Sequence, residues 1–258
     1  MAAGNLEPIS LDDTDVEYDE YVGVLEGGIA GRSEQMLDAY AELETRYGER
    51  FEAEADEAPD RFLGSAEDAE NFRAALAETY DEELYPVLGE AGEADIGGYA
   101  EFQDTVRALA ELNHVRFLDH LDTARSAVAK VRNHSSNAQS LLNQVGEILT
   151  EKGYTHETKE PIKERFSRAK RQLTQAARLR KETSAVVKRC FLYYFTADLV
   201  REKYDVERAA FRYVDLDEPA DQRLERVREE FVRQERQIRR GRRSLKHKIE
   251  YIEKNYDV

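Results

Sequence analysis

Apolar residues recur in a seven-residue pattern over most of the second half of the chain, and this pattern constrains the fold more than any other feature. Between residues 121 and 149 the spacing alternates between three and four, which keeps one apolar seam on one side of a helix. The seam positions are Leu121, Ala124, Val128, Val131, Ser135, Ala138, Leu142, Val145 and Leu149. A pattern of this length predicts a helix longer than globular domains usually contain.

The same pattern resumes after a short link at residues 153–157. Gly153 is a natural helix stop, Thr158 can cap a new helix, and Pro161 falls in the first turn, where a missing amide hydrogen costs little. The second seam comprises Ile162, Phe166, Ala169, Leu173, Ala176, Arg180, Thr183, Val187, Cys190, Tyr194, Ala197, Arg201 and Tyr204. Two long helices joined by about five residues are expected to lie antiparallel.

A third long helix is predicted from about residue 218. It carries Leu224, Phe231, Ile238, Leu245 and Ile252 at a spacing of seven. The companion positions Gln234, Gly241 and Lys248 are not apolar, and Ile249 and Tyr256 are expected to take over one position later. The predicted fold is therefore all-α: a long antiparallel helical hairpin with a third long helix, forming a coiled-coil-like rod or bundle over residues 99–258.

The N-terminal part differs from this pattern. Residues 1–30 hold a dense acidic tract and several glycines, which predicts a flexible acidic arm. Residues 31–98 are expected to form a smaller acidic helical region. One helix is predicted at residues 33–55, with an apolar face of Met36, Tyr40, Leu43, Tyr47 and Phe51, and another begins after the capping residue Ser65. The glycine-rich stretch at residues 89–98 is the predicted domain boundary.

Charge is distributed unevenly along the chain. The 54 acidic residues outnumber the 38 basic residues, for a net charge of -16. Residues 1–123 contain 33 acidic residues and 7 arginines, whereas residues 124–258 contain 21 acidic and 31 basic residues. Such an excess of carboxylates indicates a salt-adapted, halophilic protein, because molar salt screens their mutual repulsion. An ordinary acidic protein is the alternative.

The densest basic segment lies in the third predicted helix and contains no acidic residue. Its members are Arg236, Arg239, Arg240, Arg242, Arg243, Lys246 and Lys248. Such a run can follow a phosphate backbone, so these residues are candidate contacts to an anionic partner. The alternatives are a solvated helix face or pairing with the acidic half. The run contains neither Phe nor Tyr, which argues against nucleic-acid binding in high salt, where stacking has to supplement charge.

Two further features have a structural and a functional interpretation. The aromatic cluster of Phe191, Tyr193, Tyr194 and Phe195 covers more than one helix face, so it needs cover from the N-terminal helices or from a partner.

Glu111 and His114 form one E-x-x-H motif, but a di-iron bundle needs two such motifs. No metal or other cofactor is expected, although a metal-dependent bundle enzyme remains an alternative.

Motifs for catalysis are absent from the sequence. Cys190, the only cysteine, falls on an apolar seam, which predicts a packed and unreactive thiol. The chain is expected to be a non-enzymatic scaffold or adaptor that self-associates or binds a protein partner, with nucleic-acid or chromatin binding as the alternative. The start of the chain does not resemble a signal peptide and no apolar run is long enough to cross a membrane, so a cytoplasmic location is predicted.

Overall fold

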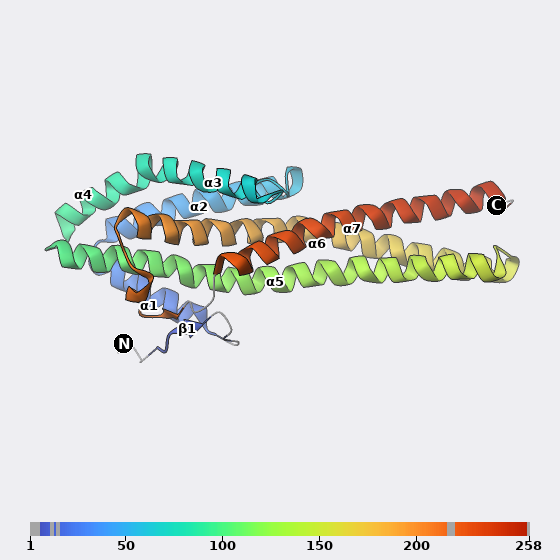
Figure 1. Ribbon diagram of the computed structural model, residues 1–258, viewed down its shortest axis with the longest axis horizontal. Helices are drawn as coiled ribbons and strands as arrows, with labels where there is room; N and C mark the ends of the chain where they lie inside the picture. The colour runs from blue at the N-terminus through green and yellow to red at the C-terminus, as the bar shows by residue number, and fades with distance from the viewer. Residues whose placement is uncertain (1–5, 11–12, 14–15, 216–219, 257–258) are drawn as a thin grey trace. The chain divides into compact units, whose positions relative to one another are not determined.

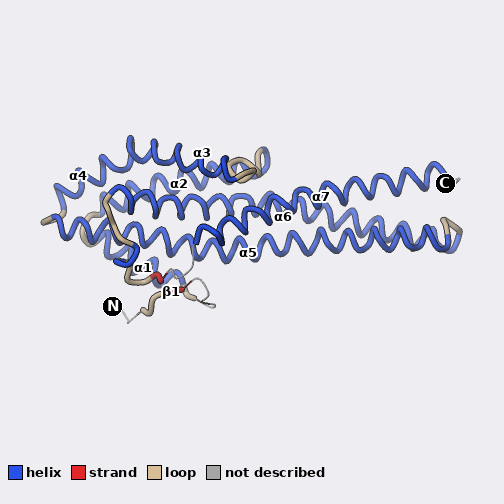
Figure 2. Tube along the Cα trace, in the orientation of Figure 1, coloured by secondary structure: helices blue, strands red, loops and turns tan. Residues whose placement is uncertain are grey.

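The computed structural model describes residues 6–10, 13, 16–215 and 220–256, and nearly all of these residues lie in helices (Figure 1, Figure 2). The prediction of an all-α fold is confirmed. The helices are α1 (Tyr18–Ala30), α2 (Glu34–Glu57), α3 (Ala66–Thr79), α4 (Tyr85–Asp95), α5 (Tyr99–Lys152), α6 (His156–Lys203) and α7 (Ala220–Asn255). Between them lie a π-helical segment (Tyr80–Leu84), a 3₁₀ turn (Arg208–Ala210) and a parallel pair of two-residue strands, β1 (Ile9–Ser10) and β2 (Val214–Asp215).

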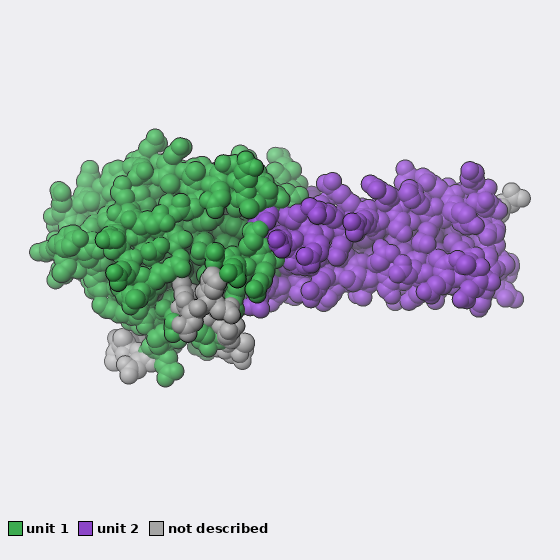
Figure 3. All heavy atoms as spheres, viewed as in Figure 1, with its two compact units in different colours: residues 1–124, 184–226 green, residues 125–183, 227–258 purple. Residues whose placement is uncertain are grey.

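The chain divides into two compact units (Figure 3). Unit 1 comprises residues 1–124 and 184–226, and unit 2 comprises residues 125–183 and 227–258. The division falls inside α5, α6 and α7 rather than at residues 89–98. Gly89 and Gly92 both lie in α4, and a Cβ atom at Gly92 would come within 2.5 Å of the Phe102 ring. This glycine permits close packing on α5.

Unit 1 is built on the predicted apolar face of α2. All five residues of that face are buried, and the Phe51 and Tyr47 rings pack against Phe72 of α3. Ser33 and Ser65 act as the N-caps of α2 and α3, accepting hydrogen bonds from the backbone amides of Met36 and Asp68. These caps satisfy amide groups that a helix start leaves without partners.

Residues 18–30 form α1 and not the flexible arm that the acidic tract predicts. The glycines at positions 23, 27 and 28 weaken a helix, but Leu25 and Ile29 are buried, with exposed fractions of 3% and 0%. Burial of these two side chains offsets the low helix propensity. Asp12 and Asp15 of the acidic tract lie outside the described residues.

Unit 2 contains three helical segments, from α5, α6 and α7. One buried cluster joins Val131, Ala176 and Ile238, and another joins Val145, Ile162 and Ile252. Along α5 the partners on α6 run in the opposite direction, while those on α7 run in the same direction. The contacts are compatible with the predicted antiparallel hairpin of α5 and α6, with α7 parallel to α5.

Polar seam residues in unit 2 meet polar partners. The Ser135 hydroxyl donates to the Gln234 side-chain oxygen at 3.0 Å, and Gln234 is 1% exposed. Arg180 is also buried; its guanidinium lies 4.4 Å from the Phe231 ring centroid and 3.1 Å from the Glu235 carboxylate. Because a buried polar group without a partner is costly, these contacts favour this register of the helices.

The apolar seam of α7 follows the prediction only in part. Phe231, Ile238 and Ile252 are buried, and Tyr256 packs against Tyr154. Ile249 is 37% exposed, so the prediction that it takes over the seam is wrong. The polar Gln234 and the small Gly241 occupy the buried positions themselves, which removes the need for a shifted apolar residue.

Substitution of Gly241 by alanine is expected to destabilise unit 2. A Cβ atom there would lie 2.6 Å from Cδ2 of Leu173, which is itself 2% exposed. Overpacking of this kind costs about 1–3 kcal/mol, more than the ~1 kcal/mol that alanine contributes to helix propensity. Urea unfolding followed by circular dichroism measures the difference. Gly89→Ala in α4, where nothing lies within 4 Å, is the control and should stabilise; equal stabilisation by both would contradict the close packing.

Candidate functional site

Unit 2 is strongly basic, although the chain as a whole is acidic. Its 91 residues include 23 Lys and Arg against 12 Asp and Glu, a net charge of +11. Unit 1 accordingly carries -27. Salt adaptation gives a reason for an excess of carboxylates on exposed surface, but gives none for an excess of cations. The basic surface of unit 2 is therefore the first candidate for a functional site.

The predicted basic segment lies on the exposed part of α7. Six of its seven cationic residues are exposed, and Lys248 is half-buried. The arrangement follows from helix geometry: residues turn by about 100° per position, so the burial of Ile238 and Gly241 keeps Arg236, Arg240 and Arg243 off the buried face of α7. Three arginines at spacings of four and three thus form one stripe.

Few of these cations have carboxylate partners. Arg239 pairs with Glu235 and Lys246 with Glu250, both within α7. Within the described part of the chain, no carboxylate lies within ion-pair distance of the remaining five, which are Arg236, Arg240, Arg242, Arg243 and Lys248. Their positive charge is available to a partner in solution.

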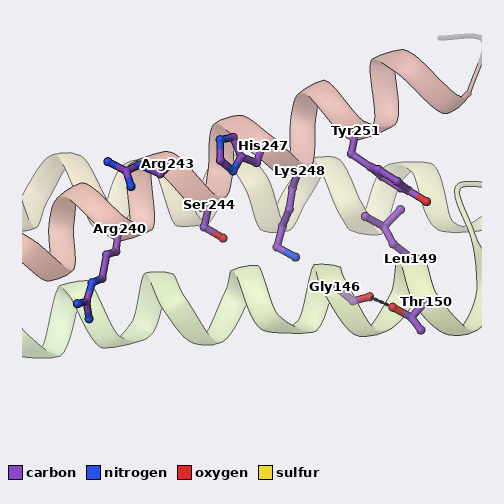
Figure 4. A pocket seen from close by; sticks show the side chains of 9 residues that line it. All are labelled: Gly146, Leu149, Thr150, Arg240, Arg243, Ser244, His247, Lys248 and Tyr251. Carbon is purple, nitrogen blue, oxygen red and sulfur yellow. Dashed lines mark hydrogen bonds between the residues drawn. The ribbon is translucent and has the colours of Figure 1, made fainter.

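A groove of about 720 Å³ lies between α7 and α5 in unit 2 (Figure 4). It is lined by Gly146, Leu149, Thr150, Arg240, Arg243, Ser244, His247, Lys248 and Tyr251. Arg240, Ser244 and Lys248 extend from α7 toward α5 in this view. A Cβ atom at Gly146 would come within 2.8 Å of the Lys248 ammonium, so the glycine makes room for that cation beside α5.

Tyr251 is the aromatic residue of the groove, and it was not singled out from the sequence. Its side chain is 51% exposed and its ring centroid lies 6.3 Å from that of Tyr256. The basic segment ends at Lys248 and contains no aromatic residue, but Tyr251 follows 11 positions after Arg240, close to three helical turns. Extending the helical periodicity past the last cation would have found it. Tyr251 thus supplies an aromatic ring beside a basic segment that contains neither Phe nor Tyr.

The predicted docking cluster on α6 is buried within unit 1. The exposed fractions of Phe191, Tyr193, Tyr194 and Phe195 lie between 4% and 8%. Phe195 packs against Phe72 of α3, and the Tyr193 hydroxyl donates to Glu44 of α2 at 2.5 Å. Cys190 is completely buried beside them, and burial raises the pKa of its thiol above the ordinary value. The N-terminal helices of this chain therefore cover the cluster.

The E-x-x-H pair does not form a metal site with other residues. Both carboxylate oxygens of Glu111 are engaged, one by the backbone amides of Arg212 and Tyr213 and the other by Arg107 at 2.6 Å. Burial raises the pKa of Glu111 despite these hydrogen bonds. In the described ranges, no group of three or more His, Cys, Asp or Glu side chains could hold a metal ion.

His114 is completely buried, and neither ring nitrogen has a hydrogen-bond partner among the described residues. Its neighbours are the rings of Phe117, Tyr194 and Phe211, at centroid distances of 5.3–6.3 Å. Burial, reinforced by the nearby Arg208, lowers the pKa of His114 to about 3. The imidazole is therefore neutral at ordinary pH and belongs to the apolar core of unit 1.

Comparisons with protein-family models, with curated proteins and with solved structures give no match to this sequence. Within the described residues, none of the helices combines the length and the apolar character needed to cross a bilayer.

Proposed function

We propose that this chain is a non-enzymatic protein that binds a nucleic acid through α7 of unit 2. The observation that carries the proposal is the set of five cations in the basic segment without a carboxylate at ion-pair distance among the described residues. Phosphate groups are the anions that such a stripe fits, because a polymer of phosphates meets several arginines at once and releases its counterions.

The main physical argument against this function is the high salt concentration in which a salt-adapted protein works, because salt weakens binding to phosphates. A protein with about 6–10 phosphate contacts loses roughly 10³–10⁵ in affinity between 50 and 200 mM salt when charge alone holds the complex. Tyr251, which lines the same groove one turn after Lys248, adds a contact that salt does not screen. Stacking of a base on an aromatic ring contributes about 1–3 kcal/mol.

A self-associating scaffold, the first expectation from the sequence, has less support. Coiled-coil association needs a free apolar seam. The seams of α5, α6 and α7 are used within unit 2, where Val131, Ala176 and Ile238 pack together. The exposed large apolar side chains in the described ranges are scattered: Tyr99, Ile249 and Tyr251.

Replacement of Arg236, Arg240 and Arg243 together by glutamine is expected to weaken nucleic-acid binding by about 100-fold, since each lost charged contact is worth roughly 1 kcal/mol or more. Fluorescence anisotropy of a labelled oligonucleotide of about 20 bases, from about 0.2 to about 2 M KCl, measures the affinity. The logarithm of the association constant falls linearly with the logarithm of the KCl concentration. The magnitude of this slope should decrease by about 2 in the variant, because three phosphate contacts are lost.

The matched control removes the same charge from exposed positions of α6 in unit 2, as Lys163→Gln, Lys170→Gln and Arg171→Gln. It should reduce affinity by only a few-fold. Equal losses in both triple variants would show that net charge, and not α7, governs binding. Competition by polyglutamate as effective as that by the oligonucleotide would point to an acidic protein partner, and absence of binding at every salt concentration would also reject the proposal.

A further inference from the structure

The groove between α5 and α7 combines two kinds of contact. Arg240, Arg243 and Lys248 supply positive charge, and the half-exposed Tyr251 supplies the face or edge of an aromatic ring beside Leu149. A groove that bound phosphate alone would not need an apolar wall. The combination fits a ligand that has both a phosphate and a flat ring, which is the chemistry of a nucleotide unit.

Hydrogen-bonding groups complete the lining. The Thr150 hydroxyl donates to the Gly146 carbonyl at 2.8 Å, so its oxygen remains able to accept a hydrogen bond from a ligand. Ser244 and His247 lie on the α7 side. The groove thus presents acceptor and donor groups near the ring, which is what the edge of a nucleobase can use.

Whether the nucleic acid is single-stranded or double-stranded decides whether the Tyr251 ring can stack on a base. In a duplex each base lies between its stacked neighbours, and its faces are not available to a side chain. In a single strand an unstacked base can place its face on an aromatic ring, irrespective of sequence. A ring within a groove, next to cations, is therefore useful to a single strand and not to an intact duplex.

We infer that this groove holds an unstacked base of a single-stranded nucleic acid on Tyr251, with the adjacent phosphate on Lys248 and phosphates further along the strand on Arg243 and Arg240. The inference rests on the proposed function and narrows its ligand to single strands. Gly146 has a positioning role, because its missing side chain leaves space for the Lys248 ammonium beside α5.

The preference for single strands is expected to grow with salt. A duplex on the basic segment is held by charge and loses affinity steeply as KCl rises. Stacking on Tyr251 persists, and single strands have a shallower salt dependence than duplexes. The full-length protein should therefore bind a single strand at least ten-fold more tightly than the duplex of the same sequence near 1 M KCl.

Three variants of the full-length protein test this inference. Tyr251→Ala should weaken single-strand binding about ten-fold and leave duplex binding within about two-fold, because only the stacked base is lost. Tyr251→Phe keeps the ring and should retain the affinity for both. Arg236→Gln removes a cation that does not line the groove and should weaken both ligands by a similar factor.

A fluorescence measurement reports on the ring directly. The chain contains no tryptophan, so Tyr251→Trp introduces a single indole. Its emission should be quenched by a single strand and unaffected by a duplex. Equal affinity for both ligands, unchanged in Tyr251→Ala and without quenching, would overturn the single-strand inference while leaving nucleic-acid binding intact. Absence of binding to either ligand would overturn both.

Discussion

Replacing Glu54 by alanine is expected to lower the free energy of unfolding by about 3–5 kcal/mol, because it leaves a buried ammonium without its counter-charge. The Lys188 side chain of α6 has an exposed fraction of 0%, and its Nζ lies 3.1 Å from Glu54 Oε2 of α2. Its other hydrogen-bond acceptor is the Ala58 carbonyl, also at 3.1 Å. The neutral carbonyl cannot replace the carboxylate.

The Glu54 carboxylate is stabilised by more than one cation. Burial opposes its ionisation, but hydrogen bonds from Arg50 and Lys188 outweigh this effect and hold the pKa of Glu54 below its ordinary value. Arg61 also donates to Glu54, at 2.9 Å. Lys188→Met should therefore destabilise less than Glu54→Ala, since the carboxylate keeps two arginine partners.

Urea unfolding in high KCl, followed by circular dichroism, measures these differences. Glu52→Ala is the matched control, because Glu52 lies two residues away on α2 and also pairs with α6, through Arg189 at 2.7 Å, but is 65% exposed. Its loss should change stability by no more than about 0.5–1 kcal/mol. The double variant Glu54→Ala/Lys188→Met should be more stable than Glu54→Ala. Equal effects of the Glu52 and Glu54 substitutions would contradict a buried pair.

The His114→Phe variant is expected to lose a large part of the pH dependence of stability between pH 3 and 6.5. The pKa of His114 is about 3 in the folded chain, against 6.5 for an ordinary histidine. Within this window the unfolded chain takes up a proton that the folded chain does not. Stability due to the neutral imidazole is therefore complete above pH 6.5 and is lost as pH falls, by about 1.4 kcal/mol per pH unit.

The measurement is the difference between the unfolding free energies of the wild-type protein and the variant across this pH range, in which the contributions of other titrating groups cancel. The difference should amount to roughly 4 kcal/mol over the window. Phenylalanine also removes two buried nitrogens without partners, so the variant should be at least as stable at pH 7. His114→Leu, which cannot overpack against Phe117 and Phe211, is the second variant. If the difference in unfolding free energy does not change with pH for either variant, His114 is protonated or solvated in the folded state.

Features that depend on neighbouring positions in the sequence were predicted well. The long helices α5 and α6, and the N-caps Ser33 and Ser65, follow from periodicity and from side-chain chemistry within one or two turns. Helix α1 was missed because its glycines disfavour a helix, while the burial of Leu25 and Ile29 that stabilises it involves residues elsewhere in the chain.

The candidate site likewise has one part that the sequence predicts and another that only the tertiary structure shows. The basic segment was recognised from the sequence because its seven cations lie within residues 236–248 of one helix. The groove was not, since Gly146 and Lys248 are about 100 positions apart and meet only when α5 and α7 pack in parallel.

The sequence by itself determined the all-α class, the extents of the long helices and the uneven distribution of charge along the chain, because all three depend on a local repeat or on composition. Tertiary structure alone decided which cations remain without carboxylates, which aromatic residue joins them and which lysine is buried with Glu54. The physical reason is that ion pairing, burial and groove formation require atoms from distant segments within a few ångströms, and helix packing sets those distances.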